Sequence, residues 1–138
     1  MPSETETAAR VGAVLDIPLN RFLGVRLRDP ADPAAGLWFP VGASARNQAG
    51  VLHGGVVTTL LDTASYLALL PRLSDTEHAV THDQTVSLLR PVAADARVDV
   101  TATVLRRGRA VAFMRAEAVV DGELVATAQV TKSVVRLG

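Results

Sequence analysis

The chain has 138 residues, 49% of them hydrophobic, and its 14 Lys and Arg residues balance 14 Asp and Glu residues. This length predicts a single domain with a substantial apolar core. A net charge near zero gives no electrostatic footprint for nucleic acid or an anionic membrane, and the absence of cysteine excludes disulfides, thiolate metal sites and a cysteine nucleophile.

The N-terminal end of the chain differs in composition from the rest. Residues 1–10 are mostly polar and lack the apolar centre of a signal peptide. Nowhere does the sequence hold the run of about 18 apolar residues that a membrane-spanning helix requires. We therefore expect a flexible N-terminus over residues 1–10, one domain over residues 11–138, no membrane association and a cytoplasmic location.

The first predicted elements are short. Val11–Ile17 is typical of a short helix that Pro18 ends. Apolar and charged residues alternate over Gly24–Arg28, and Leu37–Val41 follows as a second strand after a turn rich in Pro and Asp. Together the two strands predict a hairpin, in which Pro40 favours an edge because proline cannot donate a ladder hydrogen bond.

A long helix is predicted from about Gly54 to Leu70, ended by Pro71. Its apolar residues recur at helical spacing on one stripe, which consists of Val57, Leu60, Leu61, Ala64, Leu67 and Ala68. The opposite face carries hydroxyl groups and one carboxylate: Thr58, Thr59, Asp62, Ser65 and Tyr66.

Four long strands follow the helix, at 79–89, 97–105, 110–120 and 124–137. Asp121-Gly122, between the last two, is typical of a type I′ hairpin turn. The strand at 110–120 carries alanine repeatedly on one face, and such small side chains allow a helix to lie close to a sheet. The order of elements predicts an α+β fold in which an antiparallel sheet wraps around one central helix.

The most informative segment is His53-Gly54-Gly55, followed seven residues later by Asp62. Paired glycines allow a backbone to approach a ligand closely, and free N–H groups at a helix start can polarise a carbonyl oxygen. Asp62 has no cation three or four positions away to pair with. The combination indicates an oxyanion site with an acid, base or nucleophile beside it.

Each candidate residue also has a purely structural interpretation. Asp62 could be a solvated carboxylate, His53 a residue bonded to the backbone at the helix start, and Asn47 a simple turn residue. Thr81 could be an ordinary strand residue. Three arginines flank Gly108 at a predicted hairpin tip, where they could be solvated or could meet phosphates: Arg106, Arg107 and Arg109.

The histidines do not have the spacing of a metal site. His78 and His82 are four residues apart, but His82 lies in a predicted strand, whereas the H-x-x-x-H pattern requires a helix. The sequence also lacks the Gly-x-Ser-x-Gly elbow of serine hydrolases and the glycine patterns of nucleotide-phosphate loops. We therefore expect no metal ion.

In combination these residues resemble the hotdog-fold acyl-CoA thioesterases, in particular their phenylacetate-degradation (PaaI-like) branch. The resemblance runs from about Asn47 to Lys132 and rests on an Asn, five residues, His-Gly-Gly, and an Asp seven positions after the second glycine. Four later segments also match in the right order: Val80-Thr81-His82-Asp83, Arg90-Pro91, Arg107-Gly108-Arg109 and Asp121-Gly122.

The resemblance implies a hotdog fold and a role for each candidate residue. Asp62 would be the general base or the nucleophile that attacks the thioester. The Gly54 N–H, aided by Asn47, would hold the thioester oxygen. His53 would orient Asn47 or lie near the leaving sulfur, with Gly55 beside it at the helix start.

The resemblance also implies an oligomer with shared sites. Thr81 would come from the neighbouring subunit and hold the attacking water, and dimers would pair into tetramers. No cofactor is needed. From the residue pattern alone, and not from the resemblance, the arginines around Gly108 are candidates to meet the substrate's CoA phosphates: Arg106, Arg107 and Arg109. Tyr66 departs from those branches that carry a small hydroxyl residue one turn after the acid, which leaves the substrate class open.

We therefore interpret the chain as a homo-oligomeric acyl-CoA thioesterase that releases a carboxylic acid and free CoA. Two other functions stay open: hydration of an enoyl thioester, and non-catalytic binding of an acyl thioester or a small ligand. The sequence does not determine whether the acyl group is aromatic or aliphatic, or whether CoA or a carrier protein bears it.

Overall fold

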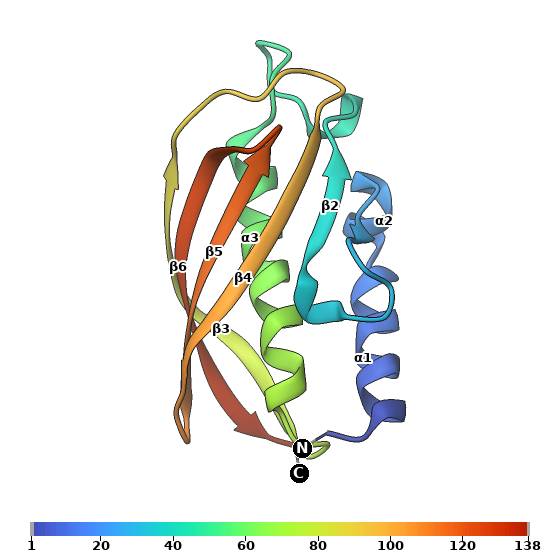
Figure 1. Cartoon of the computed structure of the whole chain (residues 1–138), viewed down its shortest axis with the longest axis vertical. Coiled ribbons are helices and arrows are strands. Elements are labelled where there is room, and N and C mark those ends of the chain that lie inside the picture. Colours follow the sequence, from blue (N-terminus) through green and yellow to red (C-terminus); the bar gives the residue numbers. More distant parts are fainter. Residues whose placement is uncertain (1, 138) are drawn as a thin grey trace.

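The computed structural model describes residues 2–137 and shows one sheet curled around one long helix, α3 (Gly54–Leu69) (Figure 1). The sheet has six strands in the order β1-β2-β4-β5-β6-β3, and all neighbours are antiparallel. The strands are β1 (Arg26–Leu27), β2 (Leu37–Pro40), β3 (Glu77–Leu88), β4 (Arg97–Arg107), β5 (Val111–Val120) and β6 (Glu123–Arg136). This architecture confirms the predicted α+β hotdog fold.

The apolar stripe of α3 lies against the middle of the sheet, where β5 offers small side chains. The residues of this contact that have no exposed surface include Leu60, Leu61, Ala64 and Leu67 on α3, and Ala112, Ala116 and Ala118 on β5. Because alanine projects little from a strand, the helix backbone can lie close to the sheet. Polar side chains on the flanks of α3 can then reach the strands on either side.

The ends of α3 follow the predicted signals, but its polar face differs in one position. His53 precedes the helix as its N-cap, and Pro71 lies in a 3₁₀ turn, Leu70–Arg72, that ends it. Ser65 is buried, although the pattern assigned it to the polar face. Its hydroxyl donates to the Leu61 carbonyl oxygen at 2.9 Å, so the buried group is satisfied within the helix.

The N-terminal region is more helical than the sequence pattern predicted. Helix α1 spans Glu4–Leu15 and therefore begins inside the segment that we expected to be flexible, and a second helix, α2, spans Pro18–Leu23. The Ser3 hydroxyl caps α1 by accepting from the Glu6 N–H at 3.1 Å. A serine cap followed by acidic residues in the first turn stabilises a helix start, which explains why the polar segment forms a helix.

The predicted hairpin is confirmed as β1 and β2, with Arg26 opposite Trp38. β2 is not an edge strand, since β4 pairs with its other side. Pro40 nevertheless has a strand on one side only, because β1 is too short to reach it. Short 3₁₀ turns, Pro33–Ala35 and Ala43–Ala45, flank β2.

The turn between β5 and β6 has the geometry that the sequence predicts. Asp121 and Gly122 have φ angles of 49° and 79°, as the predicted I′ turn between β5 and β6 requires.

Within residues 2–137, no helix is both long enough and apolar enough to cross a membrane.

Gly36 provides a test of how the β1–β2 hairpin packs. Its φ is +97°, and an added Cβ would overlap the Val100 carbonyl oxygen on β4. Gly36→Ala should therefore lower the free energy of unfolding by more than about 1 kcal/mol. Gly12→Ala in α1 is the matched control, because nothing lies within 4 Å of its added Cβ. The control should raise stability by about 0.5–1 kcal/mol, and equal effects in thermal unfolding would contradict this account.

Candidate functional site

Asp62, Thr81 and Lys132 form a hydrogen-bonded cluster between the helix and the sheet. The Thr81 hydroxyl donates to Asp62 Oδ1 at 2.6 Å, and Lys132 Nζ donates to the same oxygen at 2.9 Å. Lys132 Nζ also donates to the Thr81 hydroxyl oxygen at 2.9 Å. Two donors thus converge on one carboxylate oxygen of Asp62, whereas no donor from the described chain binds its Oδ2.

Lys132 is a site residue that the sequence analysis does not identify. It is 2% exposed and stands on the core-facing side of β6, in line with Ala128 and Val130. Lysine is almost never buried to this extent unless its ammonium group is paired. The signal was present in the sequence, because alternation along 124–137 assigns Lys132 to the apolar face.

A β-bulge directs Thr81 toward Asp62. Thr81 pairs with Lys132 and Asp83 pairs with Thr131, which leaves His82 as the extra residue of β3. Thr81 therefore shares a face with Lys132 and reaches Asp62 within a single chain. We accordingly correct the prediction that a neighbouring subunit donates Thr81 to this carboxylate.

A cavity of about 520 Å³ opens beside this cluster. Tyr66 lines it and packs edge-on against His78, with ring centroids 5.8 Å apart. Burial raises the pKa of the Tyr66 phenol above its ordinary value, and the protonated hydroxyl can donate a hydrogen bond into the cavity. The apolar wall of the cavity comes from α1 and the residues after it, namely Ala13, Val14 and Ile17.

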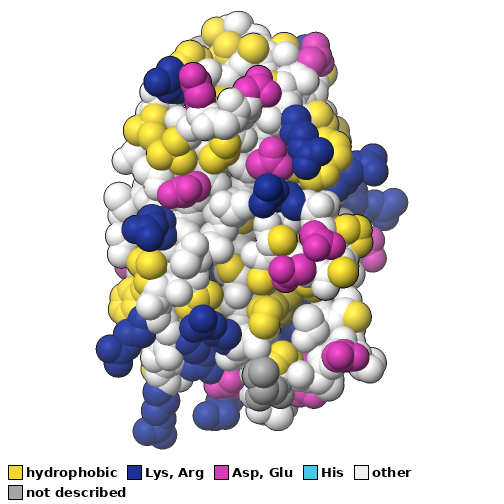
Figure 2. All heavy atoms as spheres, in the orientation of Figure 1, with side chains coloured by type: hydrophobic (Ala, Val, Ile, Leu, Met, Phe, Trp, Pro, Cys, Tyr) yellow, Lys and Arg dark blue, Asp and Glu magenta, His cyan; other side chains and the backbone are white. Residues whose placement is uncertain are grey.

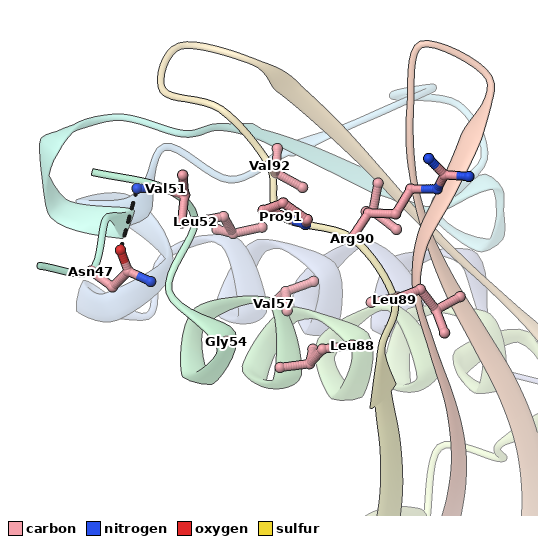
Figure 3. Close-up of a pocket in the computed structure, with 12 residues that line it drawn as sticks. Asn47, Val51, Leu52, Gly54, Val57, Leu88, Leu89, Arg90, Pro91 and Val92 are labelled. Atoms are coloured by element: carbon pink, nitrogen blue, oxygen red, sulfur yellow. Dashed lines mark hydrogen bonds between the residues drawn. The ribbon is translucent and has the colours of Figure 1, made fainter. Parts of the chain in front are cut away.

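Asn47 and Gly54 line a different cavity, of about 310 Å³ (Figure 3). Asn47 Oδ1 accepts from the backbone N–H groups of Ala49, at 2.9 Å, and Val51, at 3.3 Å, so Asn47 does act as a turn residue. Its Nδ2 has no acceptor within residues 2–137. The Gly54 N–H, at the start of α3, has none there either. Both donors are therefore available to an oxygen atom of a ligand.

His53 and Gly55 do not join these donors. His53 Nδ1 accepts from the Gly55 N–H at 2.9 Å, and an added Cβ at Gly55 would meet the His53 ring at 3.0 Å. The exposed His53 ring lines a third cavity with Ser44 and Arg46, away from the one that holds Asn47. The structure therefore supports the interpretation of His53 as a cap at the helix start and does not show it orienting Asn47.

One chain does not bring the two parts of the predicted site together. Gly54 and Asp62 are both on α3, and eight residues of helix separate them by about 12 Å along the axis. They line separate cavities. An oxyanion donor and an attacking group must both lie about 3 Å from the reacting atoms, so these two half-sites cannot act on one thioester within a single chain.

Arg107 is held by other residues of the chain. Its Nη2 lies 2.7 Å from Glu77 Oε2, and its Nε donates to the Arg72 carbonyl oxygen at 3.4 Å. Arg106 and Arg109 are exposed, and Figure 2 shows Lys and Arg side chains gathered at the end of the molecule where the β4–β5 hairpin lies. These partners within the chain argue against the predicted contact of Arg107 with a phosphate, whereas Arg106 and Arg109 form no ion pair in the described chain.

Residues 2–137 contain no group of three or more His, Asp or Glu side chains that could hold an ion. His78 contacts the Tyr66 ring, and His82 Nδ1 lies 3.2 Å from the Ser133 hydroxyl.

The Glu77–Arg107 pair predicts a dependence of stability on pH. The Ser74 N–H and the Arg107 guanidinium donate to the Glu77 carboxylate and lower its pKa from 4.5 to about 2. A lowered folded-state pKa stabilises the protein above pH 4.5, and this contribution is lost as the pH falls toward 2. Glu77→Gln should therefore lower the thermal midpoint at neutral pH and flatten its decline in acid.

Glu123→Gln is the control for that measurement. This substitution removes the same charge, but the Glu123 side chain is 64% exposed and pairs with Arg90 at 3.5 Å. Such surface pairs contribute little to stability. Thermal midpoints are measured across the acid range. If the midpoints of Glu77→Gln and of the natural protein fall in parallel as the pH is lowered, Glu77 is not the source of this pH dependence.

Comparison with known proteins identifies the family. Residues 49–127 match the thioesterase superfamily. Mouse acyl-coenzyme A thioesterase 13 is 31% identical over 91 residues, which cover 62% of each chain. The chain spans only about two thirds of the length of the curated relatives that it matches.

Solved structures extend the likeness over most of the chain. A thioesterase of Haemophilus influenzae superposes with a TM-score of 0.84 and 25% identity, covering 94% of this chain and 90% of its own. The phenylacetic acid degradation protein PaaI of Thermus thermophilus, solved as a mutant, has a TM-score of 0.76 and 31% identity, covering 84% of this chain and 97% of its own. The chain therefore belongs to the thioesterase superfamily, with the hotdog fold.

Proposed function

We propose that this protein hydrolyses acyl-CoA thioesters to a carboxylic acid and free CoA. The observation that carries the proposal is the Asp62 carboxylate. Thr81 and Lys132 hold one of its oxygens, the other has no partner in the described chain, and the residue lines a cavity. Membership of the thioesterase superfamily and the likeness to an acyl-coenzyme A thioesterase support this class of substrate.

The separation of the two half-sites supports a dimer in which a second subunit completes each site. β3 is an edge strand of 12 residues, and most of its side chains beyond Ala79 are exposed. A long uncovered edge is a template for pairing with another chain. We infer that two β3 strands pair antiparallel about a two-fold axis; further pairing into a tetramer remains a prediction.

Contacts along β3 explain why such pairing would assemble the site. Thr81, in the first half of β3, contacts Asp62, whereas Leu88, at its end, lies against Gly54. In an antiparallel pair, the beginning of one β3 lies beside the end of the other. The Asp62 half-site of one subunit would therefore face the Gly54 and Asn47 half-site of its partner.

In this arrangement the Gly54 N–H and Asn47 Nδ2 would hold the thioester oxygen at the positive end of the α3 dipole. Asp62 Oδ2 either removes a proton from a water that attacks the carbonyl carbon, or attacks that carbon itself to give an anhydride that water hydrolyses. In both routes the C–S bond breaks, and the CoA thiolate takes up a proton. The Thr81 O–H already donates its hydrogen bond to Asp62, so the Thr81 oxygen can position the water only as an acceptor.

The alternatives fit the geometry less well. An enoyl-thioester hydratase would pair its acid with a histidine, but His53 caps the helix and lines a different cavity from Asp62. A pure binding module would need no carboxylate with an open oxygen. Incubation with a panel of thioesters separates the three functions, because they give free thiol, loss of enoyl absorbance, or binding alone. The same panel, with aromatic and aliphatic acyl groups, addresses the acyl specificity.

The exposed Arg106 and Arg109 are the remaining candidates for contact with CoA phosphates. Both guanidinium groups lie at the β4–β5 hairpin, and neither forms an ion pair within residues 2–137. Arginine binds phosphate oxygens well because its N–H groups form a planar fork.

Asp62→Asn removes the carboxylate charge and keeps the size of the side chain. Thiol release should fall by about 10²-fold or more, the scale of lost acid–base catalysis. The protein should still fold but with a lower thermal midpoint, because Lys132 would lose its anionic partner. Asp121→Asn, the same change in the β5–β6 turn, should leave thiol release unchanged. Normal turnover by folded Asp62→Asn would remove Asp62 from the mechanism.

Mixed dimers test the shared site. Suppose that Asp62→Asn and Asn47→Ala each abolish most activity when expressed alone. If a site takes Asp62 from one subunit and Asn47 from the other, a mixed dimer has one site with both lesions and one with neither. Random pairing makes half of the dimers mixed, so co-expression should leave about a quarter of all sites intact.

The control co-expresses Asp62→Asn with Thr81→Val. Thr81 and Asp62 touch within one chain, so every site of a mixed dimer would carry a lesion and no activity should return. Differential tags establish that mixed dimers form. Rescue by Thr81→Val in place of Asn47→Ala would reverse the assignment of residues to subunits.

A further inference from the structure

We propose that Lys132 is a positioning residue for thioester hydrolysis, which orients the Asp62 carboxylate directly and through Thr81. The inference rests on the proposed function and assigns a task to a buried ammonium group that thioester binding alone would not need. It follows from the burial of Lys132 and from the direction of three hydrogen bonds.

Stability does not explain a lysine at this position. The other residues on the same face of β6 include Ala126, Ala128 and Val130, all of them buried and apolar. Burying an ammonium group is costly, and replacement of a buried ion pair by apolar residues of similar volume is often neutral or stabilising. An apolar side chain would therefore satisfy the core of the sheet at least as well as Lys132 does.

The hydrogen bonds of the cluster can run in only one direction. A lysine ammonium group donates and cannot accept, so the Thr81 oxygen must accept from Lys132 Nζ. The single Thr81 proton is then left for Asp62 Oδ1. Lys132 thus fixes the rotation of the Thr81 hydroxyl, and both residues bind Oδ1.

The consequence is an asymmetric carboxylate. With Oδ1 held by two donors, Asp62 Oδ2 is the oxygen left to meet a water or a thioester carbon. Arg10 also lines this cavity, but its guanidinium binds Glu6 and the Glu77 carbonyl oxygen and forms no hydrogen bond with Asp62. Lys132 is therefore the cation that orients the reacting group.

Lys132→Met is the first test, because methionine fills the space and makes no hydrogen bond. The turnover number for acyl-CoA should fall by about 10²-fold, the scale of a misplaced reacting group, while KM stays within about threefold. Val130→Ala, two residues away on the same face, is the matched control and should lower the thermal midpoint with little effect on turnover. A turnover number within twofold of the natural protein would overturn the proposal.

Two further measurements hold even if Lys132→Met folds poorly. Lys132→Ala removes a fragment equivalent to propylammonium, and the adjoining cavity gives that cation access to the vacant space. Added propylammonium should restore turnover saturably, whereas tetramethylammonium, which lacks N–H groups, and propan-1-ol, which lacks the charge, should not. Recovery of the thermal midpoint without recovery of turnover would reduce Lys132 to a structural residue.

The double variant Asp62→Asn/Lys132→Met tests whether Lys132 acts through Asp62. It removes both charges, so its thermal midpoint should exceed that of Asp62→Asn, and its residual turnover should equal that of Asp62→Asn. If the turnover of the double variant is lower than that of Asp62→Asn by the same factor as Lys132→Met lowers it in the natural protein, Lys132 does not act through Asp62. Failure of the natural protein to release thiol from any acyl-CoA would overturn the proposed function itself, whereas an active natural protein with an active Lys132→Met variant overturns only this inference.

Discussion

The close packing of α3 on the alanine-rich face of the sheet is the constraint on which the rest of the structure depends. Leu60 and Leu61 on the helix are fully buried against a surface that includes Ala116. Small side chains minimise the distance between helix and strands while apolar area is still removed from water. The helix flank then lies within hydrogen-bond reach of β3 and β6, so that Asp62 can meet two strands at once.

The packing of α3 on the sheet also allows one charged side chain, Lys132, to be buried in the core. Lys132 stands where β6 would otherwise be apolar, and its ammonium group is compensated by Asp62 and Thr81. Asp62 itself remains partly exposed, with 34% of its side-chain surface accessible. The cluster therefore extends from the buried interior to a cavity in which the Asp62 carboxylate is accessible.

The helix also determines how far apart the two half-sites lie. Gly54 begins α3 and Asp62 lies in its middle, so about 12 Å of helix separates the Gly54 N–H from the Asp62 carboxylate. No loop movement can shorten that distance. The exposed β3 edge contacts Asp62 through Thr81 and Gly54 through Leu88. Antiparallel pairing of two β3 strands about a two-fold axis would therefore place the Asp62 half-site of one subunit beside the Gly54 half-site of the other.

Local spacing in the sequence determined α3, the long strands, the Asp121-Gly122 turn and the family, because periodicity, turn chemistry and short motifs act over a few residues. Only the tertiary structure decided which groups meet: the β3 bulge directs Thr81, Lys132 pairs with Asp62 from 70 positions away, and Glu77 engages Arg107. Pairing at such separations depends on how helix and sheet pack together. A search for cations within one helical turn of Asp62 could not find Lys132 for that reason.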